Sequence, residues 1–233
     1  MIESLSCVVP AYNEARNIEA VVRDLLGAAR RVAPRAHEVI VVDDGSVDGT
    51  GDVIDGLARS EPAVRALHHP ENRGVAAATR HGLVAARHEW ILYVDGDGQF
   101  DAADLDRLVP LAAIADVVAG VRAERADPAH RRLNAALYNR LLRILFRLPV
   151  RDVNCAFKLL RRERLPTLDC RSDSAFFLAE LLIRADRAGL RFAEAPVRHR
   201  PRRYEAASGA RPSVVVPALV DAVCCRFRWR AWR

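Results

Sequence analysis

The stretch Trp90-Ile91-Leu92-Tyr93-Val94-Asp95-Gly96-Asp97-Gly98-Gln99 joins an uninterrupted apolar run to a turn that carries two carboxylates. A second run, Val39-Ile40-Val41-Val42, leads in the same way into Asp43-Asp44-Gly45-Ser46. Short runs rich in Val, Ile and aromatic residues, bounded by Gly and Asp, are typical of strands buried on both faces of a sheet. The two stretches therefore predict a parallel sheet flanked by helices.

Around these stretches, strand-like and helix-like patterns alternate. Strands are expected near residues 5–9, 37–42, 64–67, 90–94, 116–120 and 191–197. Helices are expected over residues 17–31, 75–86, 102–114, 131–148, 176–188 and 214–226, with another after Thr50. Such alternation favours βαβ units with right-handed crossovers. We predict a single α/β domain over residues 1–212 and a basic amphipathic C-terminal helix and tail over residues 213–233.

The composition is that of a folded globular protein, since 51% of the 233 residues are apolar and 28% are charged. The chain has no run of about 18 or more uncharged apolar residues, so we expect no membrane-spanning helix. Its first residues lack the basic region and cleavage site of a signal peptide. The five cysteines have neither a CxxC spacing nor a histidine at zinc spacing. These features predict a cytosolic protein with reduced thiols.

The formal charge of +6 is unevenly placed. From Arg198 onward the chain carries nine arginines against two acidic residues, Glu205 and Asp221. Such a segment suits a phosphate-bearing ligand, an anionic membrane surface or nucleic acid, and a solvated basic face is the plain alternative. We expect a phosphate-bearing ligand and peripheral membrane contact rather than nucleic acid, and the sequence predicts no oligomeric state.

Residues 131–148 have a strongly amphipathic pattern. One stripe of the predicted helix is apolar and another carries arginine; the apolar stripe is Leu133, Leu137, Leu141, Ile144, Leu145 and Leu148, and the basic one is Arg140, Arg143 and Arg147. This combination is typical of a helix that lies in a membrane interface, although the stripe could instead cover the sheet. Near the C-terminus, arginines interleaved with Phe227, Trp229 and Trp232 fit the headgroup layer.

Both acidic turns lie where predicted strands end. In open α/β sheets, ligands bind in the crevice at the carboxyl ends of the strands. Only one glycine separates Asp95 from Asp97, so both carboxylates can reach one hard cation. Mg2+ and Mn2+ are typically bound by one or two carboxylates together with substrate phosphates. The turn after residue 94 is therefore a candidate site for a divalent cation.

Four segments occur in an order that resembles glycosyltransferase family 2. They are Val9 to Glu14 (VPAYNE), Val41 to Thr50 (VVDDGSVDGT), Asn72 to Gly74 (NRG) and Asp95 to Gln99 (DGDGQ). Three further segments resemble more narrowly the dolichyl-phosphate mannosyltransferase and bacterial polyprenyl-phosphate glycosyltransferase branch. These are Asp152 with Phe157-Lys158, Glu180 to Leu182, and His199 to Arg202. The resemblance covers roughly residues 4 to 216.

This resemblance implies a nucleotide-sugar-binding domain of the glycosyltransferase A type, with a mixed, mostly parallel sheet. The donor-binding part would comprise Pro10, Tyr12, Glu14, Val42, Asp43 and Asp44. The Mg2+ or Mn2+ site would comprise Asp95, Asp97 and Gln99, with Gly96 between the carboxylates. Physically, a carboxylate can accept from a base or ribose and a tyrosine ring can pack on a base. For Asp43, a local turn or a helix cap is the structural alternative.

Three arginines match positions at which that branch carries arginine. Arg122 follows a predicted strand, Arg132 begins the amphipathic segment, and Arg202 lies in the HxPR motif. The resemblance implies that they face donor or acceptor phosphate, for which a bidentate guanidinium is well shaped. We expect Asp97, Arg122 and Arg202 to be catalytic and Arg132 to contribute to donor binding.

The implied activity is that of a metal-dependent inverting glycosyltransferase. We expect a GDP- or UDP-sugar as donor and a polyprenyl phosphate as acceptor, at the cytoplasmic membrane face. A phosphate monoester is already ionised at neutral pH, whereas a hydroxyl acceptor needs a general base. The alternative is therefore a hydroxyl on a soluble metabolite or glycan, with Asp173 as the base.

Two other classes of protein fit less well. A dinucleotide-dependent oxidoreductase would need a Gly-x-Gly-x-x-Gly turn after the first strand, where this chain has Pro10-Ala11-Tyr12-Asn13-Glu14. A non-catalytic module that binds membrane or nucleic acid through the basic C-terminal segment is the other alternative.

Overall fold

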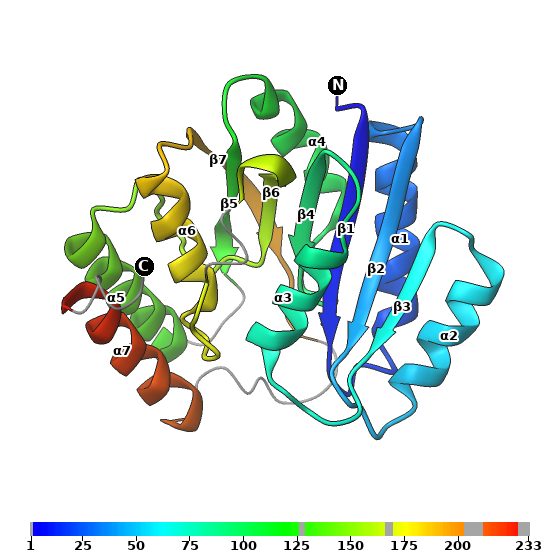
Figure 1. Ribbon diagram of the computed structural model, residues 1–233, viewed down its shortest axis with the longest axis horizontal. Coiled ribbons are helices and arrows are strands. Elements are labelled where there is room, and N and C mark those ends of the chain that lie inside the picture. The colour runs from blue at the N-terminus through cyan, green and yellow to red at the C-terminus, as the bar shows by residue number, and fades with distance from the viewer. Residues whose placement is uncertain (1, 126–128, 166–169, 203–211, 228–233) are drawn as a thin grey trace.

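The computed structural model describes residues 2–125, 129–165, 170–202 and 212–227. The predicted headgroup contacts of Trp229 and Trp232 lie outside these residues. The strands are β1 (Ser4–Ala11), β2 (Ala36–Asp43), β3 (Val64–His68), β4 (Trp90–Val94), β5 (Val117–Arg125), β6 (Phe157–Arg161) and β7 (Phe192–His199). They form one sheet in the order β3-β2-β1-β4-β6-β5-β7 (Figure 1).

The sheet is mixed but mostly parallel, as predicted. Strands β1 to β4 pair in parallel, and so do β5 and β7. Only β6, among the described strands, runs antiparallel to its neighbours, β4 and β5. The apolar runs recognised in the sequence lie side by side here, with Cys7 of β1 opposite both Val39 and Leu92.

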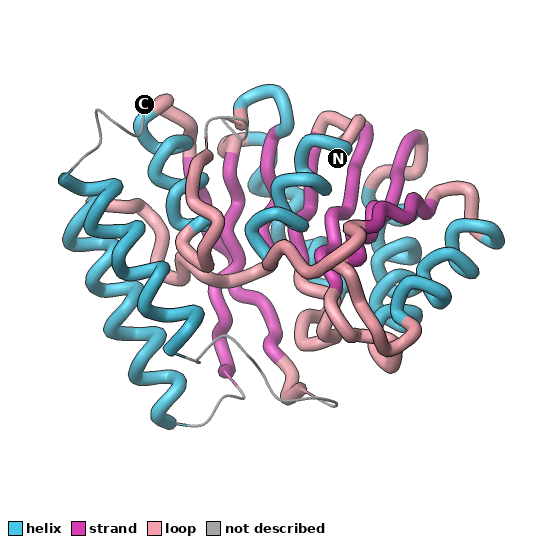
Figure 2. The backbone as a smooth tube through the Cα atoms, turned by 60° about the horizontal axis from the view of Figure 1, so that its bottom comes forward, coloured by secondary structure: helices cyan, strands magenta, loops and turns pink. Residues whose placement is uncertain are grey.

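Strand β1 is the switch point of the sheet, because it pairs with β2 on one side and with β4 on the other. The loops that follow these three parallel strands therefore open on the same edge, which is where ligands bind in such sheets. Figure 2 shows loops gathered along this edge. The topology thus places the two acidic turns at one edge of the sheet.

Helices cover both faces (Figure 1). On one face, α1 (Ile18–Val32), α2 (Thr50–Ser60) and the single turn α4 (Leu105–Leu108) share an apolar core. On the other, the core is shared by α3 (Val75–Ala85), α5 (Ala129–Phe146), α6 (Phe177–Arg187) and α7 (Pro212–Phe227). Helix α1 illustrates the cause, since Ile18, Val22, Leu25 and Ala29 recur at helical spacing and all are buried.

Two elements differ from the expectation. Residues 157–161 are not among the strands expected from the sequence, yet β6 pairs there between β4 and β5. The helix predicted over residues 102–114 is broken into 3-10 segments, Ala102–Asp104 and Val109–Ala113, around the single turn α4. Pro110 explains the end of α4 at Leu108, since proline lacks an amide hydrogen and its ring clashes with the preceding turn.

Helix α5 does not cover the sheet with its predicted apolar stripe. Leu142 is fully buried, and Tyr138 and Phe146 pack partly against the core. Of the stripe residues, Leu133, Leu137, Leu141 and Ile144 are exposed, Leu145 is half-buried, and Leu148, just after the helix, is buried in the core. None of the helices within the described residues is long and apolar enough to cross a membrane.

Candidate active site

The turn after β4 presents its two carboxylates from a fully buried strand. The Tyr93 hydroxyl donates to Asp95 Oδ1 at 3.0 Å, and the Gln99 amide donates to Asp97 Oδ1 at 3.0 Å. The second oxygen of each carboxylate accepts no hydrogen bond from a described residue. One oxygen of each aspartate therefore orients the carboxylate, and the other can bind a ligand.

The carboxylates of Asp95 and Asp97 repel each other when both are ionised. Burial, followed by the charge of Asp97, raises the pKa of Asp95 from 3.8 to about 7. The hydrogen bond from Tyr93 and the charges of Arg122 and Arg202 act in the opposite direction. A divalent cation would relieve the repulsion, and paired carboxylate oxygens are the hard ligands that Mg2+ and Mn2+ prefer.

A cation bound by Asp95 and Asp97 would need further ligands from the substrate and from water. No group of three or more His, Cys, Asp or Glu side chains within the described residues is placed to hold a metal. Mg2+ is usually bound through one or two carboxylates plus substrate phosphates and water. Asp95 and Asp97 therefore fit a cation that arrives with a diphosphate.

The end of β1 borders the turn. Tyr12 follows the strand and is 46% exposed, which leaves its ring accessible for packing on a base. A Cβ at Gly96 would come within 3.1 Å of the Pro10 carbonyl oxygen, so glycine allows the acidic turn to lie against β1. Val42, opposite Pro10 in the sheet, has a fully buried side chain. The Val42 side chain therefore packs in the core beside the end of β1.

The acidic pair after β2 has partners inside the protein. Asp43 Oδ1 accepts from the Ser46 amide at 3.0 Å. This is the local turn that the sequence offered as the structural alternative for Asp43. Asp44 accepts from the amides of residues 73 and 74 at 3.0 and 2.8 Å, and lies 2.7 Å from His69 Nδ1. These bonds join the turn after β2 to the start of α3. Nucleoside binding by the two carboxylates stays a prediction.

The chain after β7 folds back onto this edge. Arg202 forms an ion pair with Glu14, which also accepts from Asn17 Nδ2 at 2.7 Å. Gln99 donates its side-chain amide to the Arg200 carbonyl oxygen at 3.0 Å, and the Arg200 amide donates to the Gln99 carbonyl oxygen at 2.7 Å. The fold thus joins three predicted site residues, while metal binding by Gln99 and phosphate binding by Arg202 stay predictions.

Arg122 is oriented by a carboxylate. Its Nε and Nη2 each donate to an oxygen of Asp152 at 2.7 Å, with the side chains 10% and 8% exposed. Asn139 of α5 donates to Asp152 Oδ1 at 3.3 Å and accepts from the Val153 amide at 3.1 Å. Sequence reasoning missed Asn139, because one polar residue on the inner side of an amphipathic helix leaves no pattern.

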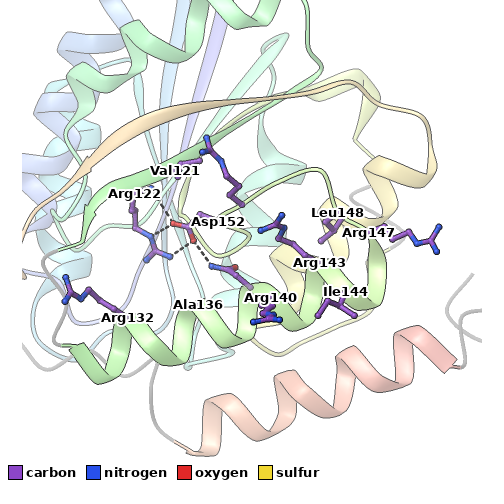
Figure 3. Close-up of a pocket in the computed structure, with 12 residues that line it drawn as sticks. Val121, Arg122, Arg132, Ala136, Arg140, Arg143, Ile144, Arg147, Leu148 and Asp152 are labelled. Atoms are coloured by element: carbon purple, nitrogen blue, oxygen red, sulfur yellow. Dashed lines mark hydrogen bonds and ion pairs between the residues drawn. The ribbon is translucent and has the colours of Figure 1, made fainter.

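An open groove of about 830 Å³ runs along α5, with Arg122 at its inner side (Figure 3). Its arginines are Arg122, Arg132, Arg140, Arg143, Arg147 and Arg151, and Val121, Ala136, Asn139, Ile144, Leu148 and Asp152 complete the lining. We call this the α5 groove. Arg122 pairs with Asp152 and Arg151 with Glu194, whereas the other four arginines have no carboxylate partner among the described residues.

Lys158 is a buried amine that sequence reasoning noted only within a motif. It is the only lysine of the chain and is fully buried in β6, opposite Tyr93 and Ala119. Its Nζ donates to the Cys155 carbonyl oxygen. Burial lowers the pKa of the Lys158 ammonium, while nearby acidic groups, among them Asp95, act to raise it. The fold therefore places the amine of Lys158 in the strand beside Tyr93, behind the acidic turn.

Asp173 makes its contacts elsewhere. Its side chain is 79% exposed and pairs with Arg80 of α3 at 3.0 Å. Arg80 also donates to the Ser172 carbonyl oxygen at 2.9 Å. Within the described residues, Asp173 has no hydrogen bond or ion pair with the acidic turn or with Arg122. A role for Asp173 as a base stays a prediction.

Comparison with known proteins adds a family and a fold. The profile of the family described as Glycosyl transferase family 2 matches residues 6–168. Glycosyltransferase AglD of Haloferax volcanii is 36% identical over 209 residues, covering 85% of this chain and 33% of that protein. Dolichyl-phosphate beta-glucosyltransferase ALG5C of Trichomonas vaginalis is 32% identical over 208 residues, covering 82% of this chain and 62% of that protein. The chain thus spans 33% to 62% of the length of these two relatives.

Among solved structures, glucosyl-3-phosphoglycerate synthase of Mycobacterium tuberculosis is similar in fold. That crystal structure, a complex with Mn2+ and UDP-glucose, has a TM-score of 0.69 and 21% sequence identity. The similarity covers 94% of this chain and 79% of that chain. It confirms the predicted α/β architecture.

Proposed function

Because the chain belongs to glycosyl transferase family 2, we propose that it transfers a sugar from a GDP- or UDP-sugar to a polyprenyl phosphate, with Mg2+ or Mn2+ as cofactor. The donor chemistry is supported by the acidic turn, whose two carboxylates each keep one oxygen for a ligand. The acceptor class is supported by the similarity to a dolichyl-phosphate beta-glucosyltransferase, since dolichyl phosphate is a polyprenyl phosphate. A polyprenyl chain stays in the bilayer, so the proposal includes peripheral contact with the cytoplasmic membrane face.

The observation that carries the proposal is the adjacency of the acidic turn and the α5 groove. Arg122 lines the groove, and its charge also acts against the rise in the pKa of Asp95. The groove therefore offers guanidinium groups for an acceptor phosphate next to carboxylates for a donor cation. We assign the acceptor phosphate to Arg122, and the donor diphosphate to the acidic turn together with Arg132 and Arg202.

The reaction is a single in-line displacement. An oxygen of the acceptor phosphate attacks the anomeric carbon and forms a new C–O bond, while the bond from that carbon to the nucleoside diphosphate breaks and its electron pair leaves with the diphosphate. No proton must be removed from an ionised phosphate, so no general base is required. Asp95 and Asp97 would hold the cation, which offsets the charge of the leaving diphosphate. The configuration of the sugar inverts.

The proposal is tested by assaying purified protein with UDP- and GDP-sugars, a polyprenyl phosphate in detergent and Mn2+. We expect transfer that stops on chelation and that falls on the order of 100-fold in Asp97→Asn, by comparison with the loss of other charge-stabilising groups. Asp106→Asn, on the exposed side of α4, is the matched control. Transfer that survives both chelation and Asp97→Asn would refute the metal role.

A hydroxyl acceptor is the second candidate, because Asp173 is exposed and held by Arg80 in the loop before α6. Asp173→Ala separates the two reactions. It should abolish transfer to a hydroxyl, which needs a base, and leave transfer to a phosphate largely intact.

A further inference from the structure

We propose that α5 and α7 together form a docking surface for a bilayer that contains anionic phospholipid, and that Arg140, Arg143 and Arg147 bind its headgroup phosphates. This inference deepens the proposed function and rests on it in one respect, namely that the acceptor lies in a bilayer. The surface itself is argued from exposure, spacing and charge.

The apolar part of the surface consists of two exposed stripes. On α5, Leu133, Leu137 and Ile144 are 60%, 56% and 67% exposed. On α7, Val216, Val220, Val223 and Phe227 follow one another at helical spacing, with Phe227 at 76% exposure. The two helices pack against each other and lie side by side in both views (Figures 1 and 2). Apolar side chains on neighbouring helices would enter the acyl boundary together.

The helices are anchored from the opposite side, so the stripes are not a loosely packed core. Leu142 of α5 is fully buried, and Ala218, Ala222 and Cys225 of α7 are buried in the same cluster. Asp221 of α7 accepts from the hydroxyls of Ser172 and Ser174 at 2.7 Å each. Each helix thus has an inner side packed on the domain and an outer side that is apolar and exposed.

The charged part lies directly beside the α5 stripe. Arg140, Arg143 and Arg147 recur at helical spacing along the groove (Figure 3). They have no carboxylate partner among the described residues. Like charges three or four residues apart on a helix repel, so this row lowers stability unless an external anion binds it. Anionic phospholipid supplies such anions in the plane that apolar side chains enter.

Two other occupants fit this surface less well, one because of charge and one because of side-chain type. A second copy placed face to face would bring one arginine row against another, which is repulsive. Single-stranded RNA would be expected to meet aromatic stacking platforms, whereas these stripes are aliphatic except for Phe227. A bilayer with acidic headgroups satisfies the aliphatic stripes and the arginine row at once. It also places the α5 groove, and Arg122 within it, at the level of headgroup phosphates.

The test is flotation of the full chain with vesicles of phosphatidylcholine, alone or mixed with phosphatidylglycerol. We expect binding to the mixed vesicles that weakens with salt, and much weaker binding to phosphatidylcholine alone. The triple variant Arg140→Gln, Arg143→Gln, Arg147→Gln should lose affinity for mixed vesicles by roughly 100-fold. Arg35→Gln, Arg59→Gln, Arg164→Gln removes the same charge from exposed positions elsewhere and is the control.

Leu137→Ser with Val220→Ser should also reduce binding, because it shortens both stripes. Equal binding to both vesicle types, an equal loss in the control triple variant, preferential binding to RNA, or a dimer that Val220→Ser dissociates would each overturn the proposal. A nucleotide thermal-shift assay with Mn2+ keeps the two proposals apart. Vesicle binding without nucleotide binding refutes the function alone, and nucleotide binding without vesicle binding refutes the surface alone.

Discussion

Arg202 and Glu14 form an ion pair that joins residues 188 positions apart in the sequence. It links the chain after β7 to the turn after β1, beside the carboxylates of the acidic turn. Both side chains are largely shielded from solvent, with Glu14 at 7% and Arg202 at 20% exposure. Glu14 therefore does more than its motif implied, because it positions the arginine expected to meet the donor diphosphate.

Arg202→Met should remove the ion pair between Arg202 and the buried carboxylate of Glu14. We expect the free energy of unfolding to fall by about 1–3 kcal/mol, and Glu14→Gln to have a similar effect. The double variant should lose less than the sum of the two, since each single change breaks the same pair. Urea titration measures all three variants, and additive losses would show that the pair contributes no coupling.

Asp95 predicts a pH dependence for the metal-free protein. In the unfolded chain its carboxyl has its ordinary pKa of 3.8, whereas burial and Asp97 raise the pKa to about 7 in the folded protein. Between these values the unfolded state binds fewer protons, so the free energy of unfolding falls as the pH rises. Asp95→Asn should lack this contribution and should be more stable than the wild type above pH 7, by on the order of 4 kcal/mol.

Calorimetry across this pH range compares the wild type with Asp95→Asn, and Asp106→Asn, at an exposed surface pair, serves as the control. Adding Mn2+ should reduce the wild-type decline, because the metal displaces the proton from Asp95. Parallel curves for the wild type and Asp95→Asn would contradict the assignment.

The pair formed by Arg122 and Asp152 predicts a large cost for losing one partner. Asp152→Asn removes the carboxylate that accepts two hydrogen bonds from the shielded Arg122, and breaking a buried pair of this kind costs about 3–5 kcal/mol. The surface pair of Arg31 and Asp106, with side chains about half exposed, provides the comparison. Arg31→Gln should cost less than about 1 kcal/mol. Thermal unfolding that shows equal losses in both variants would argue against a buried role for Asp152.

Replacing Lys158 by arginine should destabilise the protein. Lys158 is the only lysine of the chain, and arginine occupies all the other positions of this kind. The position is fully buried between two strands, and Lys158→Arg inserts a larger, planar group there. We expect a loss of about 1–3 kcal/mol from overpacking. Arg59→Lys on exposed α2 should be near neutral. Guanidinium titration measures both, and a Lys158→Arg variant as stable as the wild type would show that the site has unused space.

Asp221 should control the opening of α7. Its two serine hydrogen bonds tie the helix to the loop before α6. Asp221→Ala should therefore speed amide hydrogen exchange in α7 by about tenfold, equivalent to about 1.4 kcal/mol, and leave exchange in α1 unchanged. Mass-spectrometric exchange on both helices gives the answer, and unaltered protection of α7 would rule out this anchor.

The sequence by itself determined that buried strands alternate with helices and that two of them end in acidic turns. These features follow from neighbouring residues, because apolar runs and helical spacing are local properties. The carboxyl edge of a parallel sheet then groups the turns after β2 and β4 without further information. The family motifs identified the residues of that edge, and the fold confirmed where their strands lie.

Only the tertiary structure decided which charged groups at that edge have partners within the protein. Asp44 has its oxygens occupied by amides from the start of α3, and Glu14 is paired with Arg202. Lys158 is buried because β6 enters the sheet between two strands that are distant in sequence. The exposed stripe of α5 likewise depends on which side packs against the core. Hydrogen-bond partners, burial and net local charge depend on the path of the whole chain, which no local spacing records.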